Sequence, residues 1–83
     1  MSDLRKLYMR IVAANGAEQR RLLGEYAHLA LAQRSVPRMT AIGAPLLKRA
    51  SEETLSEREY NELLWRIRAY ETRLSRISKS SKR

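Results

Sequence analysis

The chain has 83 residues, no cysteine, one histidine and a formal net charge of +8. This length predicts a single domain, which buries only about 60% of its unfolded surface and is marginally stable on its own. Without cysteine there are no disulfides and no thiolate metal ligands, and one histidine is too few for a zinc site. No apolar run approaches the roughly 20 residues that span a bilayer. We therefore expect a protein of a reducing, cytoplasmic compartment.

The positive charge is unevenly distributed along the chain. Residues 1–50 carry nine Lys/Arg against three Asp/Glu, residues 51–77 carry five against six, and residues 78–83 add three basic residues. Such a balance predicts an acidic partner, which could be nucleic acid, an acidic protein or an anionic membrane surface. Solubility alone is the alternative explanation for the charge.

Two amphipathic helices are predicted in the first part of the chain. The first, over about residues 3–14, repeats apolar residues at the spacing of a stripe that faces a core, and Asn15-Gly16 ends it because both residues tolerate a left-handed backbone. The second, over about residues 17–33, has a broad apolar face. Its interior Gly24 costs about 1 kcal/mol against alanine, which predicts a close packing contact there.

Residues 36–53 form a predicted connector of mixed pattern. Val36-Pro37 ends the second helix, because the residue before proline disfavours helical geometry. Pro37 can open a short helix, Gly43-Ala44-Pro45 breaks it, and Pro45 can start another turn. We expect one or two helical turns here, folded against one side of the main helices.

The clearest helix start in the sequence lies at Ser56. With Ser56 as N-cap, Glu59 completes a capping box, and Leu55 and Tyr60 occupy the two positions of a hydrophobic staple. This helix should run to about residue 77. The predicted fold is therefore all-α: an antiparallel three-helix bundle over about 3–14, 17–33 and 57–77, with the connector 36–53. One domain spans 1–77, and a basic tail of residues 78–83 is disordered when alone.

Trp65, the only tryptophan, falls outside the apolar stripe of this last helix. At about 100° per residue it projects roughly opposite that stripe, on the side of Arg58 and Arg76. The stripe itself comprises Tyr60, Leu63, Leu64, Ile67, Tyr70, Leu74 and Ile77. An aromatic ring among arginines on a polar face is typical of a binding surface. The alternative is that the connector crosses this side of the helix and buries Trp65.

The sequence contains no arrangement that predicts catalysis. It has no glycine-rich phosphate loop, no metal-ligand cluster and no nucleophile and base spaced to serve each other. His28 has no such partner, and the glutamates near residue 57 are explained by helix capping. We expect a non-enzymatic protein without a cofactor.

Several short segments resemble the LYR family of small, basic, three-helix proteins of the mitochondrial matrix. Leu7-Tyr8-Met9-Arg10-Ile11 looks like a disturbed form of the motif that names the family, with Met9 between the tyrosine and the arginine. The resemblance extends to the succinate dehydrogenase assembly-factor branch through Leu23-Gly24-Glu25-Tyr26, Arg34, Tyr70 and Leu74.

This resemblance implies an adaptor: an assembly factor or an accessory subunit of a larger complex in the mitochondrial matrix. Many members of the family bind acylated acyl carrier protein, so an acidic carrier protein is the implied partner. By this analogy Tyr8 and Arg10 occupy the motif. The implied carrier contacts are Arg5, Lys6, Arg20, Arg21 and Arg34.

Two functions therefore remain open from the sequence. The first is a protein–protein adaptor that docks an acidic partner through its arginines and Trp65. The second is a nucleic-acid-binding protein, such as a ribosome-associated subunit or a small phage or plasmid regulator, whose basic residues neutralise phosphates. The candidate phosphate contacts are Lys48, Arg49, Lys79, Lys82 and Arg83.

Overall fold

The computed structural model describes the backbone of residues 3–80 and the side chains of residues 3–77, and all regular structure in this part is helical. The all-α prediction is confirmed. The elements in chain order are α1 (Asp3–Ala13), α2 (Gly16–Ala32), α3 (Val36–Arg38), the π-helical turn η1 (Met39–Gly43), α4 (Ala44–Ser51) and α5 (Glu57–Ser80).

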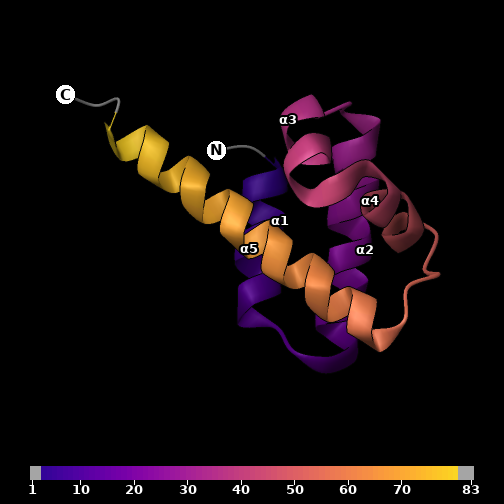
Figure 1. Ribbon diagram of the computed structural model, residues 1–83. Helices are drawn as coiled ribbons and strands as arrows, with labels where there is room; N and C mark the ends of the chain where they lie inside the picture. The colour runs from indigo at the N-terminus through magenta and orange to yellow at the C-terminus, as the bar shows by residue number, and fades with distance from the viewer. Residues whose placement is uncertain (1–2, 81–83) are drawn as a thin grey trace.

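The first two helices form an antiparallel hairpin, and the remaining elements close around it (Figure 1). Gly16 has a φ of +60°, so the predicted left-handed residue does reverse the chain between α1 and α2. α4 lies alongside α2 and makes the most extensive helix–helix contact. α5 crosses α1 and α2 diagonally, and its last turns project beyond the other helices (Figure 1).

The connector is more regular than the sequence pattern indicated. Residues 36–51 are helical throughout, in three consecutive elements, and not limited to one or two turns. Pro37 and Pro45 lie at the first positions of α3 and α4, where a missing N–H breaks no helical hydrogen bond. The close packing contact predicted at Gly24 is formed between α2 and α4. A Cβ atom added at Gly24 would lie 3.4 Å from the carbonyl oxygen of Ala50.

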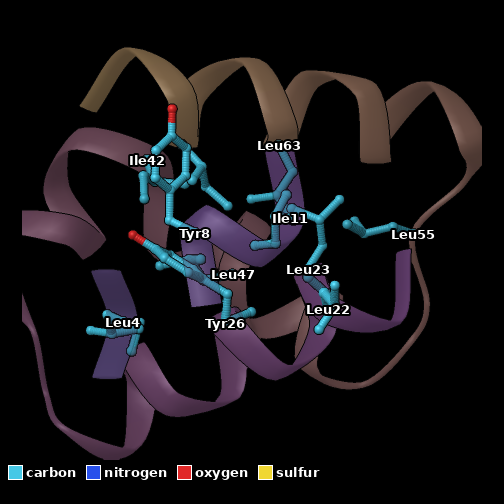
Figure 2. Packing of buried hydrophobic residues seen from close by; sticks show 14 residues of the cluster. Leu4, Tyr8, Ile11, Leu22, Leu23, Tyr26, Ile42, Leu47, Leu55 and Leu63 are labelled. Carbon is cyan, nitrogen blue, oxygen red and sulfur yellow. The ribbon is translucent and has the colours of Figure 1, made fainter. Parts of the chain in front are cut away.

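The core lies between the hairpin, α4 and the inner side of α5 (Figure 2). Its fully buried large side chains include Leu4, Ile11, Leu22, Leu23, Tyr26, Ile42, Leu47, Leu63 and Ile67. The predicted stripe of α5 is therefore confirmed at its centre, but Ile77 is 57% exposed. This residue belongs to the last turns of α5, which project past the other helices (Figure 1).

The predicted start of α5 is confirmed in detail. The Ser56 backbone N–H donates to Glu59 Oε1 at 3.1 Å, and the Glu59 backbone N–H donates to Ser56 Oγ at 3.3 Å. The hydrogen bond from the Ser56 backbone lowers the pKa of the Glu59 carboxyl group. At the other end, α5 continues to Ser80, three residues further than predicted.

Candidate partner-docking site

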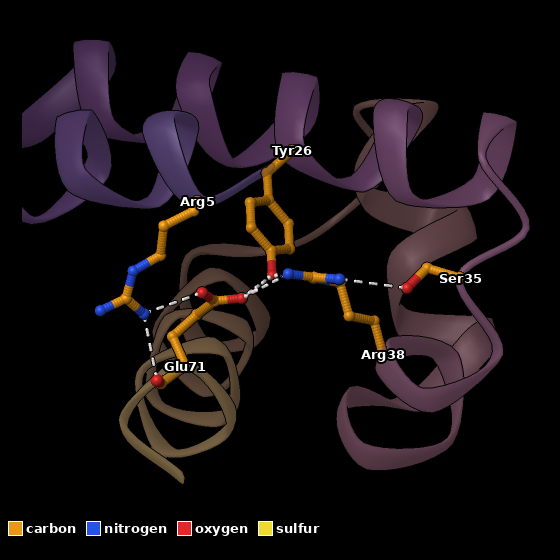
Figure 3. Close-up of polar contacts among 5 residues, drawn as sticks. All are labelled: Arg5, Tyr26, Ser35, Arg38 and Glu71. Carbon is orange, nitrogen blue, oxygen red and sulfur yellow. Dashed lines mark hydrogen bonds and ion pairs between the residues drawn. The ribbon is translucent and has the colours of Figure 1, made fainter. Parts of the chain in front are cut away.

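A fully buried carboxylate fixes α5 against the hairpin. Glu71 belongs to α5, and its side chain lies between arginines from two other parts of the chain (Figure 3). Arg5 of α1 donates to Glu71 Oε1 at 3.1 Å, and Arg38 of α3 donates to Oε2 at 3.2 Å. The Tyr26 hydroxyl of α2 donates to the same Oε2 at 2.8 Å. One side chain of α5 thus joins α1, α2 and α3.

The polar groups around Glu71 are mutually satisfied. Arg38 Nε donates to the Tyr26 hydroxyl at 3.0 Å, and Arg5 also donates to the Glu71 backbone carbonyl at 3.1 Å. Among the described residues no buried side-chain nitrogen or oxygen lacks a hydrogen-bond partner. Burial and the Glu71 carboxylate raise the pKa of the Tyr26 hydroxyl, so this hydroxyl remains a hydrogen-bond donor. We call Glu71, Arg5, Tyr26 and Arg38 the Glu71 cluster.

The Glu71 cluster determines which side of α5 faces solvent. Leu63, Ile67 and Glu71 follow one another at intervals of four residues and form the buried inner face. A rotation of the helix would move the Glu71 carboxylate into solvent. Arg38, which is largely buried, would then lose its negatively charged partner, and an unpaired buried charge carries a large energetic penalty. The opposite side of the helix is therefore held outward.

This outer face carries the exposed tryptophan. Trp65 is 71% exposed, so the prediction that it points away from the bundle is confirmed and the connector does not cover it. The connector packs instead on α2 and against α5, where Arg66 at the side of α5 donates to the Ile42 carbonyl at 3.3 Å. A hollow of about 550 Å³ opens on the outer face, lined by Trp65, Arg68, Ala69, Thr72, Arg73 and Arg76.

The arginines of the outer face have no acidic partner among the residues that the structure describes. In the part of the chain that the structure describes, Arg68, Arg73 and Arg76 form no ion pair and no side-chain hydrogen bond. Arg58, two turns before Trp65 on the same side, is also exposed and unpaired among these residues. We call Trp65, Arg68, Ala69, Thr72, Arg73 and Arg76 the outer face of α5.

Acids of α5 compensate part of the charge of the first half of the chain. Glu57 pairs with Arg20 at 3.1 Å, and Glu59 accepts from Arg49 at 2.9 Å. Glu71 forms ion pairs with Arg5 and Arg38. Because these glutamates are turned toward the other helices, the outer face is basic although residues 51–77 as a whole are not.

The remaining predicted contact residues are dispersed rather than gathered at one place. Tyr8 is buried in the core, with the Arg5 guanidinium 5.4 Å from its ring centroid. Arg21 lies between Glu18 and Glu25 on the surface of α2, at 3.1 and 3.0 Å. Four other predicted contact residues are exposed and form no ion pair in the described part of the chain: Lys6, Arg10, Arg34 and Lys48.

The predicted basic tail falls largely outside the described residues. Lys82 and Arg83 lie beyond them, and the side chain of Lys79 is not among the described side chains. Of the candidate phosphate contacts that are described, Arg49 is held by Glu59 and Lys48 is exposed.

Sequence reasoning missed Glu71 and Arg38 altogether. The available signal was a glutamate four residues after Ile67, at a position where the apolar stripe continues. Nor did sequence reasoning single out Arg68 and Arg73, which line the hollow beside Trp65.

Comparisons of the chain with family models, with curated proteins and with solved structures found no match. Among the described residues, no helix combines the length and the apolar character that crossing a membrane requires. The same residues contain no group of three or more His, Cys, Asp or Glu side chains placed to hold a metal ion.

Proposed function

We propose that this protein is a non-catalytic helical adaptor that docks an acidic protein partner through the outer face of α5. One observation carries the proposal: an exposed tryptophan lies beside three arginines that have no acidic partner within the described residues. Tryptophan and arginine are the residue types most enriched where protein interfaces gain their binding energy.

The chemistry of the outer face favours a carboxylate-bearing partner. Each guanidinium offers a planar fork of donors that matches a carboxylate, and the weak hydration of this group lowers the cost of burying it. Arg73 and Arg76 are one turn apart and repel each other in the free protein. Carboxylates of a partner would relieve this repulsion, while the indole would supply apolar contact area.

The resemblance to the LYR family names one acidic partner to test. By that analogy the partner is acyl carrier protein, the protein is an assembly factor or complex subunit, and its compartment is the mitochondrial matrix. The analogy places the contacts on α1 and α2, whereas the proposal here places them on α5. The two hypotheses therefore predict that different arginines contribute to the affinity for the acidic partner.

Trp65 provides the readout for the test, because it is the only tryptophan in the chain. Poly-L-glutamate and acyl carrier protein serve as acidic probes, and a short DNA duplex serves as the nucleic-acid probe. We expect the acidic probes to shift Trp65 fluorescence. In calorimetry, Trp65→Ala should weaken binding by about 2 kcal/mol, the loss typical of an interface hot spot.

A matched pair of charge reversals identifies the face. Arg73→Glu on the outer face of α5 should weaken binding of the acidic probes strongly. Arg10→Glu makes the same charge change at an exposed position of α1, and this variant should retain most of the affinity for the same probes. The reverse result would place the docking surface on α1. Tighter binding of the duplex, with log affinity falling by about 0.9 per phosphate contacted for each unit of log salt, would establish the nucleic-acid function instead.

A further inference from the structure

The hollow on the outer face of α5 has a floor of small side chains bordered by large ones. Its floor consists of the two short side chains Ala69 and Thr72. Trp65 and Arg76 stand at the two ends of the floor, on nearly the same side of the helix. Arg68 and Arg73 lie to the left and right of this line, about 60° and 80° around the helix from Trp65.

The separation of Trp65 and Arg76 along the helix axis accommodates the width of an α-helix. Trp65 and Arg76 are eleven positions apart, which corresponds to about 16 Å along the axis. An α-helix with its side chains is about 10–12 Å across, so one helix fits between the two larger side chains. An extended strand is only about 5 Å wide and would leave much of the hollow unfilled. The small floor residues allow a helix to approach closely.

We infer that the occupant of the outer face is an acidic α-helix of the partner, crossing α5 steeply over Ala69 and Thr72. This inference rests on the proposed function. The crossing helix places an apolar side chain against Trp65 and carboxylates against Arg76 on its other flank. Arg68 and Arg73 lie beneath it on opposite sides of α5, where acidic residues one or two turns apart can reach both.

Charge complementarity selects this occupant over a second copy of the chain. Two outer faces brought together would place arginines against arginines, with no glutamate on either face to separate them. A helix whose carboxylates recur every three or four residues meets the arginines on both sides of the floor.

The test places a larger side chain in the hollow without changing the net charge of the protein. Ala69→Leu puts a bulky side chain at the crossing point, and Ala32→Leu makes the same substitution at an exposed position of α2. Leucine is nearly as good a helix former as alanine, so neither change should unfold the protein. The probes are a stapled helical peptide with glutamates at i, i+3 and i+7 and one leucine, the same peptide with two central prolines, and poly-L-glutamate.

We expect the helical peptide to bind at least about tenfold more tightly than its proline-containing counterpart, which cannot form the helix. Ala69→Leu should weaken the helical peptide by about tenfold or more and leave poly-L-glutamate within about twofold. Ala32→Leu should change neither.

The outcomes separate the two claims. If both peptides bind equally, or if Ala69→Leu leaves the helical peptide unaffected, the crossing helix is wrong while the acidic docking surface stands. If neither the peptides nor poly-L-glutamate binds, the proposed function fails together with this inference. If the DNA duplex displaces the helical peptide more effectively than poly-L-glutamate does, the outer face is a nucleic-acid surface.

Discussion

The inner and outer faces of α5 use the same side chain, arginine, under opposite conditions. On the inner face Arg5 and Arg38 come from other helices and meet a carboxylate that is fully buried on α5. On the outer face Arg68, Arg73 and Arg76 belong to α5 and meet no acid among the described residues. Compensated arginines hold the fold together, whereas uncompensated ones are available to a partner. The net charge of residues 51–77 hides this difference. It includes the negative charge of Glu71, although Glu71 lies on the inner face and does not neutralise the arginines of the outer face.

Among changes to polar groups, the largest effect on stability should come from Glu71→Gln. The glutamine amide keeps the shape of the side chain but removes the negative charge that two arginines share. Removing one partner of a buried ion pair costs about 3–5 kcal/mol. Arg5 is partly exposed, so we expect the lower end, about 3 kcal/mol, in the free energy of unfolding measured by urea titration.

Glu62→Gln is the control for this measurement. It makes the same substitution on the same helix, but Glu62 is exposed and forms only an i,i+4 pair with Arg66 at 3.5 Å. Such a surface pair contributes about 0.5 kcal/mol or less. Equal effects of the two substitutions would mean that the Glu71 cluster does not hold α5 in place.

The second prediction concerns the Tyr26 hydroxyl, which joins Arg38 to Glu71. Tyr26→Phe removes this donor and leaves the buried carboxylate with one hydrogen bond fewer, at a cost of about 1–2 kcal/mol. Tyr60→Phe is the control, since the Tyr60 hydroxyl forms no hydrogen bond within the described residues. A Tyr26→Phe protein as stable as the Tyr60→Phe protein would contradict the bridging role.

The third prediction is a loss of stability in alkaline solution. Burial and the nearby Glu71 carboxylate raise the pKa of Tyr26 in the folded state, while the unfolded chain releases this proton near pH 10. Above that pH the unfolded state holds fewer protons than the folded state. The free energy of unfolding should therefore fall as pH rises past about 10, by up to about 1.4 kcal/mol per unit. Below pH 10 the contribution is fully present.

Tyr26→Phe tests the origin of this alkaline effect. The substitution removes the titrating group, so the difference in stability between the original protein and the variant should shrink above pH 10. A difference that stays constant from pH 8 to pH 11 would show that Tyr26 is not the group responsible.

What the sequence predicted correctly depended on neighbouring residues. The start of α5 follows from Ser56 and Glu59, three residues apart, and the direction in which Trp65 projects follows from helical spacing alone. Both are properties of one helix, so no knowledge of the tertiary arrangement was needed to find them. Whether the connector covers Trp65 was left open by the sequence, and the structure shows that Trp65 is exposed.

What it missed depended on contacts between distant segments. Arg38 and Glu71 are 33 positions apart, and Arg5 and Glu71 are 66 positions apart. A lone glutamate in an apolar stripe does not show which cations will reach it. In the connector the local signals were correct, since Pro37 and Pro45 lie in the first turns of α3 and α4 and Gly43, with a φ of +112°, separates η1 from α4. The sequence did not show that helical structure continues over the whole of residues 36–51.

The smallest expected effect defines the outer face. Trp65→Ala should change the free energy of unfolding by less than about 0.5 kcal/mol, because the indole is exposed and alanine has the higher helix propensity. Leu63→Ala, on the inner face of the same helix, should cost about 2–5 kcal/mol. A tryptophan that contributes nothing to folding but anchors binding of an acidic probe would have its role outside the molecule. If Trp65→Ala instead destabilised the free protein by more than about 1 kcal/mol, the indole would belong to the fold, and the docking surface would lose its apolar anchor.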